Sequence, residues 1–230
     1  MFEKINLEEF WDDDEYALEA YVSSDVTDEM IQEVEQELGY KLPASYIYLM
    51  KKHNGGIPKN QYCPCDTATT WANDHVGITG IYGIGREKTY SLCGEFGSKF
   101  WIEEWEYPDI GVAICDCPSA GHDMIFLDYR ECGKDGEPKV VHIDQEWDYA
   151  ITVLADNFEE FIGKLCSQVD LAKIATAKIL KEFGVENNHD FYSQDEEEGA
   201  VLYENLKAGV LEEYDITEED MEDILEEILG

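Results

Sequence analysis

The segment Tyr107-Pro-Asp-Ile-Gly-Val-Ala-Ile-Cys-Asp-Cys-Pro-Ser-Ala-Gly-His-Asp-Met-Ile-Phe-Leu-Asp-Tyr-Arg130 decides the fold of this chain. Two apolar runs rich in β-forming residues, 110–114 and 124–127, flank the polar turn at 118–123. A third run, 140–143, follows the turn Lys134-Asp-Gly-Glu137. Asp-Gly between such runs is a strong hairpin signal, because both residues tolerate positive φ. The segment therefore predicts a three-stranded antiparallel meander with polar groups gathered at its turns.

The charge balance of the 230-residue chain restricts its partners. It carries 53 acidic against 16 basic side chains, a formal net charge of −37, while 44% of its residues are hydrophobic and 12% are aromatic. This composition predicts one large folded domain, with or without an appendage, rather than a disordered chain. Such a surface repels nucleic acid and anionic membranes, so the partners we expect are cationic, either a basic protein or metal ions. A generic acidic surface without a specific partner is the alternative.

The N-terminal sequence and the cysteines predict a cytoplasmic protein. Residues 1–15 are acidic and mixed, unlike a secretory signal, and no apolar run approaches the length of about 18 residues that a membrane span needs. The seven cysteines, at positions 63, 65, 93, 115, 117, 132 and 166, form an odd set without a compact disulfide pattern. A reducing compartment fits them best.

Two helices are predicted ahead of the meander. Residues 1–24 have the pattern of a short amphipathic arm that packs on the main domain through its aromatic residues. Thr27 is a typical N-cap, an apolar stripe follows over 30–38, and Gly39 suits a left-handed C-cap. Pro43 suits the first position of a second helix, which Asn54-Gly-Gly56 ends.

The segment between these helices and the meander is expected to be irregular. Residues 57–76 have a loop-like composition, and residues 90–92 could form a short strand. The glycines at 77, 80, 83 and 85 do not form Gly-x-Gly-x-x-Gly before a helix, which favours a bent strand over a nucleotide-binding loop. After the meander, Asp156 or Asn157 caps a closing helix that reaches about residue 165.

The composition changes at about residue 166. Residues 166–230 contain 19 acidic and 4 basic side chains. Apolar periodicity predicts helices over 171–183, 201–210 and 221–228, the last with a capping-box start at Thr217 and Asp220. An acidic loop is expected at 194–198. We therefore expect an acidic helical extension.

Histidines and carboxylates occur near the turns of the meander. His142 and Asp144 share one strand face because they lie two residues apart. The set that could form a His/Asp metal site for a hydrolase is Asp116, His122, Asp123, Asp128, His142 and Asp144. Acids in turns commonly cap their own backbone, however, and this makes metal-dependent catalysis the less favoured hypothesis.

Other catalytic signals are weak. The Cys-x-Cys pairs at 63/65 and 115/117 are spaced more tightly than the ligands of structural zinc sites, so buried thiols are favoured. Whether the two pairs meet stays open. The sequence contains no nucleophile elbow, P-loop, His-Glu-x-x-His or EF-hand pattern. We expect no catalytic residue, no metal and no cofactor.

The same acids, interleaved with aromatic residues, suit a protein-binding face. Carboxylates accelerate the encounter with a basic surface, and aromatic anchors slow its release. The expected partner-binding residues are Trp101, Glu103, Glu104, Trp105, Glu106, Asp109, Asp116, His122, Asp123, Asp144, Glu146 and Trp147.

Several short motifs follow one another in order along the chain. Before the meander they are Gly39-Tyr-Lys-Leu-Pro43, Tyr46-Ile-Tyr-Leu-Met50 and Asn54-Gly-Gly56. From the meander onward they are Trp105-Glu-Tyr-Pro-Asp-Ile-Gly111, Gly121-His-Asp123, Leu127-Asp-Tyr129 and Val140-Val-His-Ile-Asp144. Together these motifs resemble the SUKH superfamily, in its Smi/Knr-type branch. The resemblance covers about residues 25–165 and leaves out the acidic extension.

The resemblance implies an α+β fold, in which two N-terminal helices lead into a mainly antiparallel twisted sheet and a closing helix. The expected organisation is an N-terminal arm at 1–24, the SUKH domain at 25–165 and the acidic helical extension at 166–230. Many bacterial members of the family are immunity proteins that bind a cognate toxin, often a nuclease, whereas others are regulatory scaffolds. The resemblance therefore favours a non-enzymatic immunity protein with a basic toxin as partner, and the scaffold is the alternative.

Overall fold

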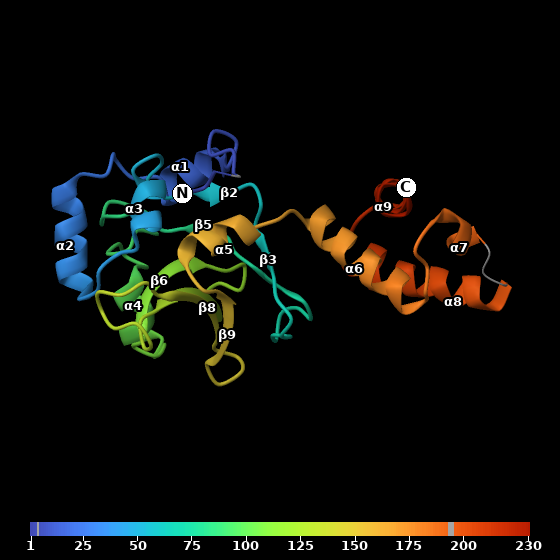
Figure 1. The fold of residues 1–230 in the computed structure, drawn as a ribbon. Coiled ribbons are helices and arrows are strands. Elements are labelled where there is room, and N and C mark those ends of the chain that lie inside the picture. Colours follow the sequence, from blue (N-terminus) through green and yellow to red (C-terminus); the bar gives the residue numbers. More distant parts are fainter. Residues whose placement is uncertain (4, 193–195) are drawn as a thin grey trace. The chain divides into compact units, whose positions relative to one another are not determined.

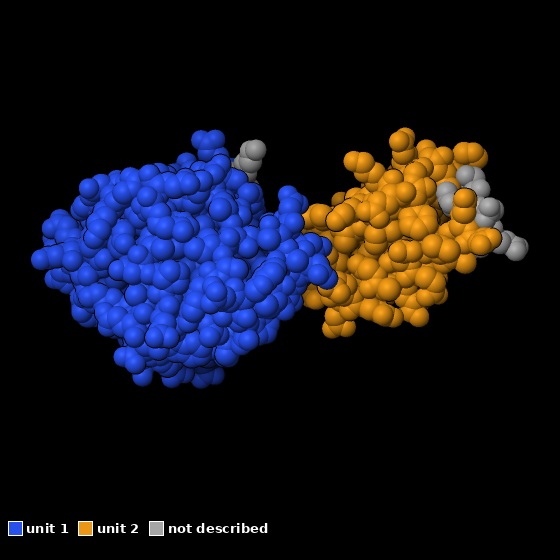
Figure 2. Space-filling model, turned by 90° about the horizontal axis from the view of Figure 1, so that it is seen from below, with its two compact units in different colours: residues 1–165 blue, residues 166–230 orange. Residues whose placement is uncertain are grey.

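The computed structural model describes residues 1–3, 5–192 and 196–230, and they form two compact units, Met1–Leu165 and Cys166–Gly230. The two units are coloured separately in Figure 2. The expected fold class is confirmed, since helices accompany an antiparallel sheet and a helical region follows it (Figure 1).

A five-stranded antiparallel sheet forms the centre of the first unit. In spatial order its strands are β5 (Gly80–Ile81), β6 (Gly111–Asp116), β7 (Asp123–Asp128), β8 (Lys139–Asp144) and β9 (Ala150–Ala155). The predicted meander is confirmed as β6, β7 and β8, with Ala113 opposite Phe126 and Leu127 opposite Val140. All residues of β6 and β7 are buried, because both faces of these strands are covered.

The turn between β7 and β8 differs from the predicted Asp-Gly hairpin. The connection runs over residues 129–138, and its positive-φ residue is Gly133 (φ 73°). Gly136 is needed for a different reason: a Cβ there would lie 2.4 Å from the carbonyl oxygen of Cys132. The Gly136 amide also donates to the Gly133 carbonyl oxygen at 3.0 Å, so the Asp135-Gly136 dipeptide completes a turn over 133–136 rather than forming a two-residue hairpin loop.

Three helices follow the predicted cap signals. Helix α2 (Asp28–Leu38) begins at Thr27, whose Oγ1 accepts from the Met30 amide at 3.2 Å, and ends at Gly39 with φ 78°. Helix α3 (Ala44–Met50) has Pro43 as its N-cap. Pro43 was expected at the first helical position, so the helix begins one residue later than predicted. Helix α5 (Phe158–Lys164) begins at Asn157, whose Oδ1 accepts from the Glu160 amide at 2.9 Å. Side-chain hydrogen bonds at the N-cap thus mark the starts of α2 and α5.

Short elements surround the sheet where loops were expected. The N-terminal arm contains β1 (Trp11–Asp12) and α1 (Glu15–Ala20), and β1 pairs with β2 (Ile57–Pro58). Strands β3 (Tyr62–Pro64) and β4 (His75–Gly77) form a second small ribbon. The prediction that 57–76 is loop-like is therefore wrong at these strands. The bent strand expected over 77–85 is divided between β4 and β5, and residues 90–92 form only an isolated bridge from Ser91 to Gly83.

One continuous core holds the first unit together. Helix α5 packs on β8 and β9 and beside α3, while α4 (Ser98–Glu104) packs on β6 (Figure 1). The ring centroids of Tyr46 in α3 and Phe158 in α5 are 4.8 Å apart, and both side chains are fully buried. Burial of large aromatic side chains of this kind contributes about 1.5–3 kcal/mol each to the stability of the fold.

The second unit is a small helical bundle. Its elements are α6 (Gln168–Glu182), α7 (Asn188–Tyr192), α8 (Glu196–Leu206), the π-helical segment η1 (Lys207–Glu212) and α9 (Glu218–Leu229). The predicted capping box of Thr217 and Asp220 is confirmed, and Ser167 with Asp170 forms another. Positions 194 and 195 of the expected acidic loop lie outside the described residues, whereas 196–198 begin α8. The bundle has buried apolar residues of its own, among them Leu180, Leu202 and Ile224.

Candidate functional site

The turn at 117–122, between β6 and β7, is fixed against helix α4. Ala120 and Gly121 have positive φ values of 57° and 101°, and a Cβ on Gly121 would lie 2.5 Å from Cζ3 of Trp101. The Tyr107 hydroxyl donates to the Gly121 carbonyl oxygen at 2.7 Å. The Asp123 amide donates to the Ser119 hydroxyl at 3.0 Å. Glycine chemistry and these hydrogen bonds together hold the turn in one conformation.

Three surface hollows meet at this turn. The first, called the aromatic hollow below, has a volume of about 290 Å³ and is lined by Tyr90, Phe96, Phe100, Trp101, Trp105, Asp116, Ala120 and Gly121. The second, of about 390 Å³, lies between the turn and residues of β3, β4 and α1, and it shares Asp116 and Ala120 with the first. The third, of about 240 Å³, includes Trp71, Ser119 and Asp123. The segment that organises the sheet thus also organises the hollowed surface.

Asp116, at the end of β6, is a buried carboxylate between two of the hollows. It is 8% exposed, and the hydroxyl of Tyr21 donates to its Oδ1 at 2.9 Å and its Oδ2 at 2.8 Å. Burial raises the pKa of Asp116 from 3.8 to about 7, although the Tyr21 hydroxyl and the Gly80 backbone partly oppose this. Gly80 permits the contact, since a Cβ there would lie 2.3 Å from Cε1 of Tyr21.

The predicted metal ligands are divided between different structural roles. His142 Nε2 lies 2.8 Å from Asp123 Oδ2, inside the sheet. Asp144 accepts from the amide of Thr70 at 2.9 Å and from its hydroxyl at 2.8 Å, which fixes the 66–72 loop to β8. In the described parts of the chain, no three His, Cys, Asp or Glu side chains are arranged to hold a metal ion.

Asp128 is separated from the other candidate ligands. The register places it opposite Gly111, at the far end of β6 from Asp116. Burial raises the pKa of Asp128, but hydrogen bonds from Arg130 outweigh this and leave that pKa lowered. Asp128 therefore forms a structural ion pair with Arg130, at 2.6 Å.

None of the seven cysteines, all of which the structure describes, forms a disulfide. Burial raises the pKa of Cys65, Cys115 and Cys117, so the neutral thiol is favoured at these positions. This is the environment of thiols that pack as small apolar side chains, rather than that of a reactive nucleophile.

The expected partner-binding residues fall into an exposed group and a buried group. The side chains within reach of a partner are Glu103, Glu104, Trp105, Glu106, Asp109, His122, Glu146 and Trp147. Those in the interior are Trp101, Asp116, Asp123 and Asp144. The interior group supports the surface from beneath and is not available to form a broad contact. Asp109 precedes β6, whereas the turn follows it, so Asp109 lies at the other end of this strand, where it contacts Tyr40.

His122 is the centre of the exposed rim. Its Nδ1 lies 3.0 Å from Gln145 Oε1 and 2.9 Å from Glu146 Oε1. Its ring centroid is 5.6 Å from that of Trp105 and 6.5 Å from that of Trp71. The rim therefore combines four separate stretches of the chain.

Trp71 belongs to this rim, although it lies in a segment that was predicted to be loop-like and was not among the expected partner-binding residues. It is 51% exposed, like Trp147 at 55%, and it follows the Thr70 contact to Asp144. A tryptophan inside a loop-like, threonine-rich segment is itself a signal for binding, because tryptophan is enriched among interface anchors. The aromatic residues Tyr16, Tyr90, Phe96 and Phe100 were likewise not grouped with the site.

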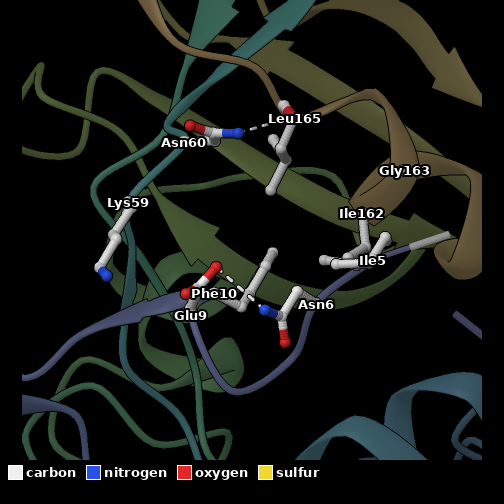
Figure 3. Close-up of a pocket in the computed structure, with 9 residues that line it drawn as sticks. All are labelled: Ile5, Asn6, Glu9, Phe10, Lys59, Asn60, Ile162, Gly163 and Leu165. Atoms are coloured by element: carbon white, nitrogen blue, oxygen red, sulfur yellow. Dashed lines mark hydrogen bonds between the residues drawn. The ribbon is translucent and has the colours of Figure 1, made fainter.

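Another hollow lies elsewhere in the first unit, between the N-terminal arm and α5. Its volume is about 510 Å³, and Figure 3 shows its lining residues, which include Asn6, Glu9, Lys59 and Asn60. Asn6 Nδ2 donates to Glu9 Oε2 at 2.9 Å, so two of the polar side chains that line this hollow already bind each other. None of its lining residues belongs to the turn.

The fold and the site together define an α+β domain whose hollowed surface is acidic and aromatic. Residues 28–162, from the start of α2 into α5, match the family model SUKH_6, described as SMI1-KNR4 cell-wall, and the chain belongs to this family. The resemblance to the Smi/Knr-type branch of the SUKH superfamily is thereby confirmed. No curated protein matches the chain significantly. Of the helices that the structure describes, none has the length and apolar character required to cross a bilayer.

Proposed function

We propose that this protein is a cytoplasmic immunity protein that binds and neutralises a cognate basic toxin in the cell that produces the toxin, without catalysis or cofactor. A nuclease domain is the favoured class of toxin, because an enzyme that acts on nucleic acid carries a basic surface. Membership of the SMI1-KNR4 family supports a protein-binding role.

One observation carries the proposal: Trp71 and Trp105 converge on His122 at a turn bordered by exposed carboxylates. Aromatic side chains of this kind supply most of the binding energy in protein interfaces. The carboxylates, Glu103, Glu104, Glu106 and Glu146, are exposed. In a chain with net charge −37 they would guide a basic partner to this surface and compete with its nucleic acid.

The proposal is tested by mixing the purified protein with the toxin domain encoded beside it, and by measuring complex formation and toxin activity. We expect a stable complex and inhibition of the toxin. The Glu103→Lys/Glu104→Lys variant on α4 should lower the association rate about tenfold or more at low salt. The matched control, Glu29→Lys/Glu33→Lys on the exposed face of α2, makes the same change in net charge and should have a much smaller effect.

Salt supplies an independent measurement. If charge guides the encounter, the association rate falls steeply as ionic strength rises, because the Debye length shortens from about 30 Å at 0.01 M to about 10 Å at 0.1 M. A rate that is flat with salt, or equal effects of the two lysine variants, would remove the electrostatic basis of the proposal. Failure to bind any neighbouring toxin domain would contradict it outright.

A regulatory scaffold is the second candidate, and the compactness of residues 166–230 favours it. In that case the acidic helical unit is a docking arm for a second protein. Removal of residues 166–230 would then abolish binding of that second protein but leave the binding function of the first unit intact. Under the immunity hypothesis alone, toxin neutralisation should persist after this removal.

A further inference from the structure

The aromatic hollow has an unusual composition for the surface of so acidic a protein. Its wall is a continuous row of rings: the centroids of Phe96 and Phe100 are 4.9 Å apart, those of Phe100 and Trp101 are 5.0 Å apart, and those of Trp101 and Trp105 are 5.5 Å apart. The only charged side chain among its lining residues is Asp116. Aromatic faces and one carboxylate attract the same kind of ligand, a cation with an apolar or planar surface.

Asp116 has no cation of its own. Among the described residues no lysine, arginine or histidine is within ion-pair distance of it, and its side-chain donor is the neutral hydroxyl of Tyr21. A buried carboxylate without a counter-ion is costly to ionise, and accordingly burial raises the pKa of Asp116 to about 7. A cation bound in the hollow would remove this cost.

Among the described residues, no lysine or arginine lies over the rings of the hollow. The lysines that lie over aromatic rings in this part of the chain are Lys52 over Tyr48 and Lys134 over Tyr40. Neither tyrosine lines the hollow. A cation for these rings would therefore come from another molecule.

We propose that the aromatic hollow binds the guanidinium group of one arginine side chain of a partner protein, with its plane on the aromatic rings and its N–H groups donating to Asp116. Arginine fits better than lysine, because its planar and weakly hydrated head stacks on aromatic faces while it donates in a fork to a carboxylate. The volume of about 290 Å³ is at the lower end for ligand pockets and suits one side chain rather than a helix. This inference rests on the proposed function only in taking a basic protein as the source of the arginine.

The Tyr21 contact makes Asp116 ready for this role. Tyr21 is fully buried and stacks on Tyr90, with ring centroids 4.6 Å apart. Its hydroxyl bonds to both carboxylate oxygens and so holds the side chain of this lining residue in place. A preorganised acceptor loses little side-chain entropy when the ligand binds.

The test uses a blocked Gly-Arg-Gly peptide and its citrulline analogue, which has nearly the same shape without the charge. Binding is followed by NMR at pH 8 and low salt, through the indole N–H signals of Trp101 and Trp105, with peptide up to about 50 mM to detect weak complexes. We expect the arginine peptide to shift both signals with an affinity at least tenfold higher than that of the citrulline peptide. Asp116→Asn should reduce the affinity for the arginine peptide to the level of the citrulline peptide.

The matched control is Asp128→Asn, because Asp128 is equally buried but lies at the opposite end of β6 and already pairs with Arg130. It should leave arginine binding unchanged. If Asp116→Asn does not fold, Phe100→Leu serves in its place, since it removes one half-buried ring from the wall and should weaken arginine binding at least threefold. Equal binding of both peptides, no shift at either tryptophan, or full arginine binding by Asp116→Asn or by Phe100→Leu would overturn the inference.

The outcomes also separate this inference from the immunity proposal. Toxin neutralisation without arginine binding would refute the arginine site and leave the proposed function standing. Arginine binding without any neutralised toxin would do the reverse.

Discussion

His142 and Asp123 form a buried pair across neighbouring strands. His142 Nε2 lies 2.8 Å from Asp123 Oδ2, and the side chains are 1% and 5% exposed. Because Asp123 is opposite Asp144 in the register, His142 is its diagonal neighbour on the same face of the sheet. Within the described structure His142 Nδ1 has no hydrogen-bond partner. Two of the candidate metal ligands of the sequence are thus part of the interior.

Removal of the histidine should destabilise the protein. His142→Leu leaves the Asp123 carboxylate buried without its partner, and we expect the free energy of unfolding to fall by about 3–5 kcal/mol. Urea denaturation followed by tryptophan fluorescence measures this. The control His122→Leu alters a half-exposed side chain and should change the stability by less than about 1 kcal/mol. Equal losses in the two variants would contradict the role of the buried pair.

Asp116 should make stability depend on pH. Burial raises its pKa from 3.8 to about 7, so between these values the folded protein keeps a proton that the unfolded chain has released. Its stabilising contribution is therefore present below pH 4 and is lost as pH rises through 7. The charge of Asp123 also raises the pKa of Asp116. Asp116 in turn raises the pKa values of Tyr21, Tyr82, Tyr90, Cys115 and Cys117.

Asp116→Asn removes this titration. Relative to the variant, the native protein should lose about 2–3 kcal/mol of unfolding free energy between pH 5 and pH 8. Urea denaturation at several pH values measures the difference between the two proteins. A difference that does not change with pH would show that Asp116 titrates normally. Asp128→Asn is the control with the opposite sign, because the pKa of Asp128 is lowered.

The turn at Gly121 should not tolerate a side chain. Gly121→Ala places a Cβ at φ 101° and 2.5 Å from the Trp101 ring, so we expect a loss of about 2 kcal/mol or more and a changed signal from the tryptophans. Gly163→Ala in α5 is the control, since nothing lies within 4 Å of its added Cβ. It should be neutral or stabilise the protein by up to about 1 kcal/mol. Similar effects of the two substitutions would refute the packing argument.

The first unit should fold without the second. All five tryptophans lie within residues 1–165, so their fluorescence reports on that unit alone. A chain shortened to residues 1–165 should have the same urea midpoint as the full chain. The slope of its unfolding free energy against urea should correspond to the surface that this unit alone exposes, and its free energy of unfolding should differ by less than about 1 kcal/mol. A large shift of the midpoint would mean that the boundary near residue 165 does not separate independent folding units.

Features that depend on local chemistry could be predicted from the sequence. The start of α2 at Thr27 and its end at Gly39 follow from groups within four residues of each terminus, and so does the capping box of Thr217. Both turns of the predicted meander lie where the sequence places them, but the connection that contains Asp135-Gly136 is longer than the predicted hairpin and has its positive φ at Gly133. Strand β9 was missed, because its half-exposed residues form only a short β-branched run at 151–153.

The sequence by itself determined the α+β class, the start and end of α2, the start of α9, the acidic charge and the family, since each depends on composition or on residues close together along the chain. Only the tertiary structure decided which polar residues are inside. Tyr21 and Asp116 are 95 positions apart, and Thr70 and Asp144 are 74 apart, yet each pair is hydrogen-bonded. The physical reason is that the burial of a side chain, and the presence of an opposite charge beside it, depend on neighbours that come from distant segments of the chain. The sequence therefore could not show that Asp116 lines an aromatic hollow, or that no cation of the described residues pairs with it.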